Sequence, residues 1–119
     1  AEPRFRDAAE AFALARRAVE LAPENGACWL ALGVAHYRAG DHEGAVTTLQ
    51  KARALRDGGN SFDGFFLALA HRQLGNKQEA RKGYDQASRW MEKNQPQNEE
   101  LLRLRAEAEE LLGIKEKQD

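Results

Sequence analysis

The chain has little of what marks secreted or membrane proteins. Its 119 residues include one cysteine, Cys28, so no internal disulfide can form and a reducing, cytoplasmic compartment is favoured. No apolar run approaches the length that spans a bilayer, and no signal-peptide pattern opens the sequence. We therefore expect a cytoplasmic protein that does not bind a membrane.

Neither sign of charge is in excess. Lys and Arg together number 18 and Asp and Glu 19, which gives a formal net charge of -1. A protein that binds nucleic acid through its phosphates needs a basic surface, and this composition does not supply one. Nucleic acid is therefore not an expected partner.

What the sequence does have is internal repetition. The same residue types recur 35 residues apart, at Leu32 and Leu67, Ala45 and Ala80, and Ala52 and Ala87. An upstream partial copy places Ala11, Ala15 and Ala18 34 residues before Ala45, Leu49 and Ala52. A period of this size is typical of a stacked array of helical hairpins, so the sequence predicts an all-α fold.

Helix-start and helix-stop signals divide the chain into about six helices. They are expected at about 7–21, 26–40, 41–56, 61–75, 76–93 and 98–113. Asp7 with Glu10 and Asn76 with Glu79 have the spacing of capping boxes, and Asp41 is expected to cap the third helix. No alternating polar and apolar run predicts a strand.

The repeated residues resemble the tetratricopeptide repeat. Its signature places Trp, Leu-Gly and Tyr on one helix and Ala, an aromatic residue, Ala and Pro on the next. The first complete copy matches at Trp29, Leu32, Gly33, Gly40, Ala45 and Ala52, and the second at Leu67, Gly75, Ala80, Tyr84 and Ala87. The copies depart from the signature at His36, Leu49, Asp57, Gly64 and Ala68. The resemblance implies a right-handed superhelix of antiparallel helix pairs.

The same resemblance divides the chain into parts of one repeat domain, 1–119. Residues 7–25 would be the second helix of a partial repeat, 26–60 and 61–95 two full repeats, and 98–113 a capping helix. The chain also resembles the repeat segments of large bacterial multidomain proteins. The sequence begins at Ala1 and not at methionine, which leaves open whether the chain is a fragment of a longer protein.

In this family the first helices of successive repeats line a concave groove that commonly binds peptides. The groove residues expected here are Leu30, Val34, Tyr37, Arg38, Phe62, Phe65, Leu69 and Arg72. Chaperone-binding members of the family grip a peptide's carboxylates with Lys, Arg and Asn at such positions. This groove is apolar instead, which favours an apolar or amphipathic segment. The alternative is that these residues are core, covered by the chain's own first or last helix.

No residue pattern indicates catalysis, a cofactor or a metal. His36 and His71 stand at equivalent places in the two copies, where each replaces an aromatic residue of the packing face. Cys28 has no histidine or acid placed to activate it, and no glycine-rich phosphate loop occurs. The carboxylates lie on mixed charged helix faces and not in a desolvated pair.

The sequence therefore favours a non-enzymatic scaffold that binds a peptide or a neighbouring domain through the groove. One alternative is self-association, with the first helix or the Phe-rich helix at 61–74 packing on another copy. Another is an accessory segment of a larger bacterial enzyme such as a serine/threonine kinase.

Overall fold

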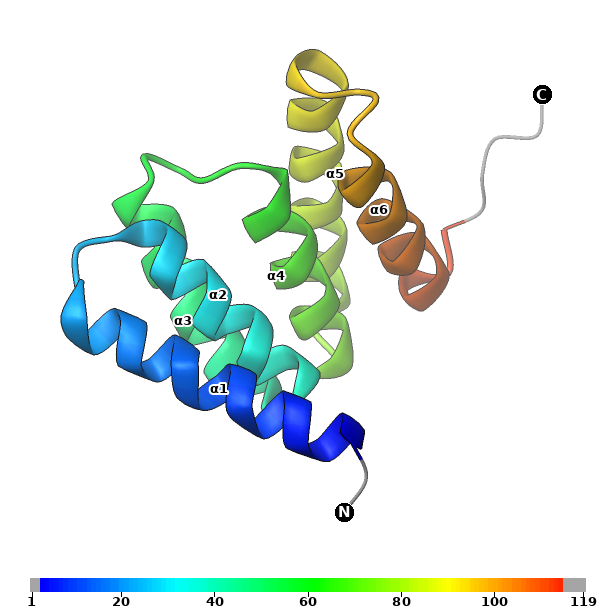
Figure 1. Cartoon of the computed structure of the whole chain (residues 1–119). Coiled ribbons are helices and arrows are strands. Elements are labelled where there is room, and N and C mark those ends of the chain that lie inside the picture. Colours follow the sequence, from blue (N-terminus) through cyan, green and yellow to red (C-terminus); the bar gives the residue numbers. More distant parts are fainter. Residues whose placement is uncertain (1–2, 115–119) are drawn as a thin grey trace. The chain divides into compact units, whose positions relative to one another are not determined.

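The computed structural model describes residues 3–114, with side chains described from Asp7 onward, and this part of the chain is all-α (Figure 1). The prediction of fold class is confirmed. The helices are α1 (Pro3–Leu21), α2 (Gly26–Arg38), α3 (His42–Leu55), α4 (Ser61–Gln73), α5 (Lys77–Asn94) and α6 (Glu99–Leu112). The chain divides after Gly59 into two compact units.

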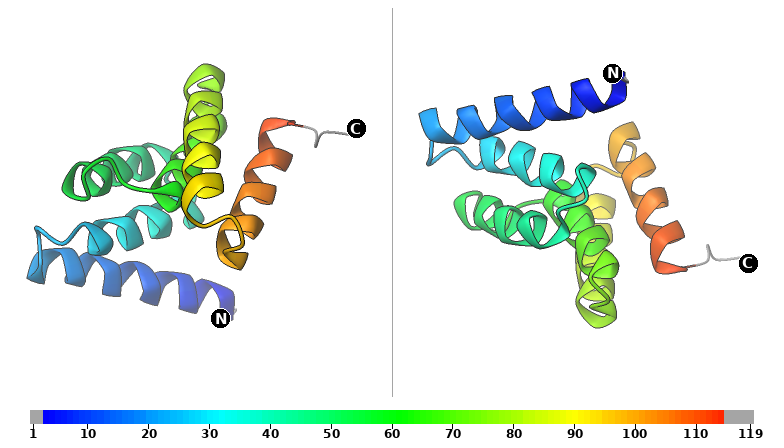
Figure 2. Two further views of the ribbon diagram at one scale, coloured as in Figure 1. Left: turned by 90° about the horizontal axis from the view of Figure 1, so that it is seen from above. Right: turned by 90° about the horizontal axis from the view of Figure 1, so that it is seen from below.

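The first unit is a helical hairpin, α2–α3, with α1 packed on α2 (Figure 2). The hairpin closes on small side chains, because Ala45 and Ala52 of α3 are fully buried and Leu32 of α2 is nearly so. A Cβ atom on Gly33 would lie 2.6 Å from Cγ of Leu49, so the missing side chain is what lets α2 approach α3. We call this Gly- and Ala-rich contact between the helices of a hairpin the packing seam.

A side chain of α2 holds the turn between α1 and α2. The indole Nε1 of Trp29 donates a hydrogen bond to the carbonyl oxygen of Pro23 over 2.8 Å. The ammonium of Lys51, on α3, lies 5.8 Å from the centre of the Trp29 ring. Trp29, on α2, therefore contacts both the turn that follows α1 and Lys51 of α3.

The second unit repeats the hairpin with α4 and α5 and adds α6, which packs on both (Figure 1). Here the seam lies at Gly64, where a Cβ atom would come within 2.9 Å of the Cβ of Ala87. The Ser61 hydroxyl also donates a 2.6 Å hydrogen bond to the carbonyl oxygen of Ala87 across the same contact. The repeated positions Leu67, Ala80 and Ala87 are all buried, so the prediction that both copies share this packing face is confirmed.

Helix α6 is amphipathic, as its sequence predicts. Leu101, Leu104 and Ala108 are buried, whereas Glu100, Arg103 and Glu110 are exposed. The Tyr84 hydroxyl of α5 donates a hydrogen bond to the Glu109 carboxylate of α6. Gly113 ends the helix at a φ of 75°, a left-handed conformation that glycine adopts without strain.

Most expected helix starts agree with the structure, and two capping predictions are wrong. Asp41 accepts from the Gly44 amide as the N-cap of α3. Asp7, by contrast, lies inside α1, because that helix begins at Pro3, and a proline fits the first turn of a helix. Asn76 does precede α5, but its side chain caps no backbone amide and instead contacts His71.

We expect Gly33→Ala to destabilise the protein and Gly83→Ala to stabilise it. Alanine gains about 1 kcal/mol over glycine in helix propensity at either site. At Gly33 the new methyl group would overlap the buried Leu49, and such overpacking costs about 1–3 kcal/mol. At Gly83 the nearest atom to a Cβ is 3.4 Å away, an ordinary contact. Urea unfolding measures both; an unfolding free energy raised by Gly33→Ala would contradict the close approach.

Tyr84→Phe should destabilise the second unit by about 1–2 kcal/mol, because it removes a hydrogen bond to a carboxylate. Burial and the bond to Glu109 raise the pKa of Tyr84 above its ordinary 10.0. The neutral hydroxyl therefore contributes fully below about pH 10, and its contribution is lost as pH rises through the folded pKa. Urea midpoints between pH 7 and 11 should show the two proteins converging at alkaline pH. A difference that grows above pH 10 would contradict this assignment.

Candidate partner-binding site

The outer face of α2 carries an aliphatic stripe that the hairpin does not bury. One side of α2 meets α3 at the packing seam, and another meets α1, where the His36 ring lies edge-on to Phe12 at 4.9 Å. The remaining side presents Leu30 and Val34, both partly exposed, with Arg38 exposed one helical turn further on. We call this stripe, with the exposed Ala27 and Ala31, the α2 face.

Tyr37 serves the hairpin more than this face. It is 7% exposed, and its ring lies 5.2 Å from that of His42 at the start of α3. The Arg38 guanidinium lies 5.5 Å from the centre of the Tyr37 ring. Tyr37 thus supports a cation at the edge of the α2 face while contributing little surface of its own.

The groove residues that were expected on α4 differ in how far their side chains are exposed. Phe65 and Leu69 are 0% exposed, whereas Phe62 and Arg72 are partly exposed. Both α5 and α6 pack on α4, and the Phe65 ring lies 5.9 Å from that of Tyr84 on α5. Phe65 and Leu69 therefore offer no surface to a ligand in this structure. One feature of the sequence indicated part of this burial. The apolar stripe of α6 has to pack against another apolar surface, and α4 provides one.

The two equivalent histidines each contact the residue that precedes the second helix of their hairpin. Nδ1 of His36 lies 2.9 Å from Oδ2 of Asp41, and Nδ1 of His71 lies 3.2 Å from Nδ2 of Asn76. Each histidine links the first helix of its hairpin to the turn before the second helix, which is a structural role. Within the described residues, no group of three or more His, Cys, Asp or Glu side chains is placed to hold a metal ion.

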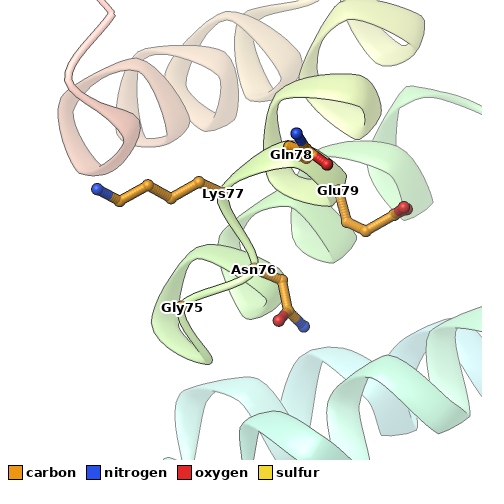
Figure 3. Close-up of a pocket in the computed structure, with 5 residues that line it drawn as sticks. All are labelled: Gly75, Asn76, Lys77, Gln78 and Glu79. Atoms are coloured by element: carbon orange, nitrogen blue, oxygen red, sulfur yellow. The ribbon is translucent and has the colours of Figure 1, made fainter.

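Two surface depressions lie at turns and not on the α2 face. One, of about 400 Å³, is lined by Gly75, Asn76, Lys77, Gln78 and Glu79 (Figure 3). The other, of about 480 Å³, lies at 22–25, between α1 and α2. In Figure 3 the Lys77 and Glu79 side chains point away from each other. Neither depression gathers polar groups around a common centre, as a small-molecule site does.

Antiparallel hairpins with small-residue seams define a helical-repeat protein. Residues 5–59 match the model of the tetratricopeptide repeat family, which supports assigning this part of the chain to that family. No curated protein is similar enough in sequence to count as a match. Tetratricopeptide repeats generally mediate protein–protein interaction as non-catalytic scaffolds. In the described part of the chain, no helix combines the length and apolar character needed to cross a bilayer.

Asp41→Ala should destabilise the first unit by about 1 kcal/mol, and Asn76→Ala the second by less. Asp41 caps α3 through the Gly44 amide, a bond for which Asn76 has no counterpart on α5. The bond from Gly44 is the main cause that lowers the pKa of Asp41 below 3.8. The stabilisation is therefore complete above about pH 4 and is lost as pH falls through the lower, folded value. Thermal unfolding between pH 2 and 7 tests both; equal losses in the two variants would contradict the assignment.

Proposed function

We propose that the chain is a non-enzymatic interaction module that binds an amphipathic helix through the α2 face. The observation that carries the proposal is the aliphatic stripe Leu30–Val34. It lies on a helix whose other sides are fixed by α1 and α3, so the stripe is held in place before a ligand arrives. A preformed surface lowers the conformational entropy that binding costs.

The chemistry of the face indicates the kind of ligand. Leu30, Ala31 and Val34 offer apolar contact along two turns, and an apolar stripe on a partner helix matches such a surface. Arg38 lies at one edge, held over Tyr37, and favours an acidic residue near that end of the ligand. Leu30 and Val34 stand where a carboxylate clamp would need Lys, Arg or Asn, so the face favours apolar contact over recognition of a free C-terminus.

In the second unit, taken by itself, Phe62 and Arg72 of α4 are the proposed contacts. Both side chains are partly exposed, so each has surface left to lose to a ligand. We leave Phe65 and Leu69 out of the proposed contacts, because burying a side chain that is already 0% exposed releases no further water. Their role in this proposal is to support the second hairpin. The single cysteine supports a cytoplasmic location for the module.

The double substitution Leu30→Asp with Val34→Asp should weaken peptide binding at least about tenfold, which corresponds to about 1.4 kcal/mol. Partly exposed Leu and Val side chains each contribute about 1 kcal/mol when a ligand completes their burial. Helical peptides selected from a displayed library against the wild-type chain supply the ligand. Fluorescence anisotropy then gives the dissociation constant of one labelled peptide for each variant.

Leu102→Asp is the matched control, because Leu102 is an exposed leucine on α6, 40% exposed, and lies outside the proposed contacts. It should bind the peptide as the wild type does. Circular dichroism should show the same helix content in all variants. Selected peptides that bind the double variant as tightly as the wild type would contradict the proposal.

A further inference from the structure

Helix α1 exposes two leucines on one flank. Leu14 is 71% and Leu21 is 73% exposed. They alternate with Ala11, which is exposed, and Ala18, which is partly exposed. The spacing 11, 14, 18, 21 places all four on one stripe, with alanine and leucine each recurring after seven residues. Leucines this exposed, repeated on one stripe of a helix, mark a surface suited to another helix.

The repeat shows what this stripe does elsewhere in the same chain. Residues 34 positions later, Ala45, Thr48 and Ala52, correspond to Ala11, Leu14 and Ala18. These three are 0%, 7% and 0% exposed on α3. The helix that lies over them is α2, since a Cβ atom on Gly26 would approach the carbonyl oxygen of Ala52. The stripe on α1 is therefore a helix-packing face, and among residues 3–114 no helix buries its leucines.

We propose that α1 of a second copy of this chain occupies the stripe, in antiparallel orientation. In the register that overlaps the two helices over most of their length, Ala11 lies opposite Leu14 of the second copy, and Leu14 opposite its Ala11. Ala18 then lies opposite Asp7, and Leu21 lies opposite position 4, which is outside the residues whose side chains are described. Both central layers set a large side chain against a small one, so the stripes interdigitate. A parallel pair would set alanine against alanine, which leaves gaps in those layers.

Charge also favours the antiparallel pair. Glu10 and Arg17 are exposed and flank the stripe on the same side, one helical turn before Leu14 and Leu21 respectively. In the register above, Glu10 of each copy lies beside Arg17 of the other, so that two opposite-charge pairs form around the two-fold axis. Parallel pairing would place these charges opposite alanines instead, namely at positions 15 and 22. The order of charges along α1 is therefore complementary to itself only when one copy is reversed.

The size of the interface predicts a weak dimer. Stable interfaces bury about 1,200–2,000 Å² in total, and two helices that meet over two or three heptads bury less. The flanking pairs are solvent-exposed, and each contributes at most about 1 kcal/mol. We expect a dissociation constant on the order of 100 µM, which makes dimerisation depend on local concentration.

Sedimentation equilibrium between 10 µM and 1 mM tests the proposal. The apparent mass of the wild-type chain should rise from 13.3 kDa toward twice that value. Leu14→Glu with Leu21→Glu should remain at the monomer mass throughout, because charges then replace both exposed leucines. Leu102→Glu, at an exposed leucine of α6, should behave as the wild type. A wild-type chain that is monomeric at 1 mM, or a double variant that still dimerises, would overturn the proposal.

A charge exchange tests the orientation. Glu10→Arg alone and Arg17→Glu alone should each weaken dimerisation about fivefold or more, because like charges then meet twice. The variant that carries both changes should recover the wild-type constant within about twofold, since opposite charges then meet again with their signs exchanged. Single variants that leave the constant unchanged, or a double variant as weak as the singles, would overturn the antiparallel arrangement. Both positions are exposed on α1, so helix content by circular dichroism should be unchanged.

Discussion

Close approach of two helices at small residues is the constraint on which the rest of the structure depends. At Gly33 and at Gly64 there is no room for a Cβ atom, and the facing residues Leu49 and Ala87 are buried. Helices packed this closely exclude water along their whole contact and fix each other's rotation about the axis. Once the rotation of a helix about its axis is fixed, the directions in which its other faces point are fixed as well.

The rotation of each helix therefore determines which of its faces stay exposed. On α2 the seam takes one side and α1 another, so Leu30 and Val34 are left partly exposed. On α4, Phe65 and Leu69 have no surface left, and α5 and α6 both pack on that helix. On α1 the stripe exposes its leucines, whereas the corresponding positions of α3 are buried. The same repeated unit therefore presents different surfaces according to what packs on each copy.

The sequence predicted what is repeated and failed where the outcome depends on tertiary packing. Small residues recur at the seam in both copies, so the hairpins and their buried positions were predictable. The start of α1 was missed because Asp7 and Glu10 have the spacing of a capping box, and local spacing does not show that the helix already began at Pro3. The complete burial of Phe65 and Leu69 was not predictable from their own helix, because an apolar helix can be covered by its own chain or by a ligand. Likewise, the pairing of His71 with Asn76 replaces a capping bond that sequence alone would assign.

The central claim is that the seam leaves the α2 face free for a partner helix. Backbone amide chemical shifts, measured by NMR while a selected amphipathic peptide is added, test it residue by residue. The account predicts the largest changes at Ala27, Leu30, Ala31, Val34 and Arg38, with little change at the seam residues Ala45, Leu49 and Ala52. Changes centred on the seam, or on Phe65 and Leu69, would contradict it, because they would mean that the peptide binds by opening a hairpin.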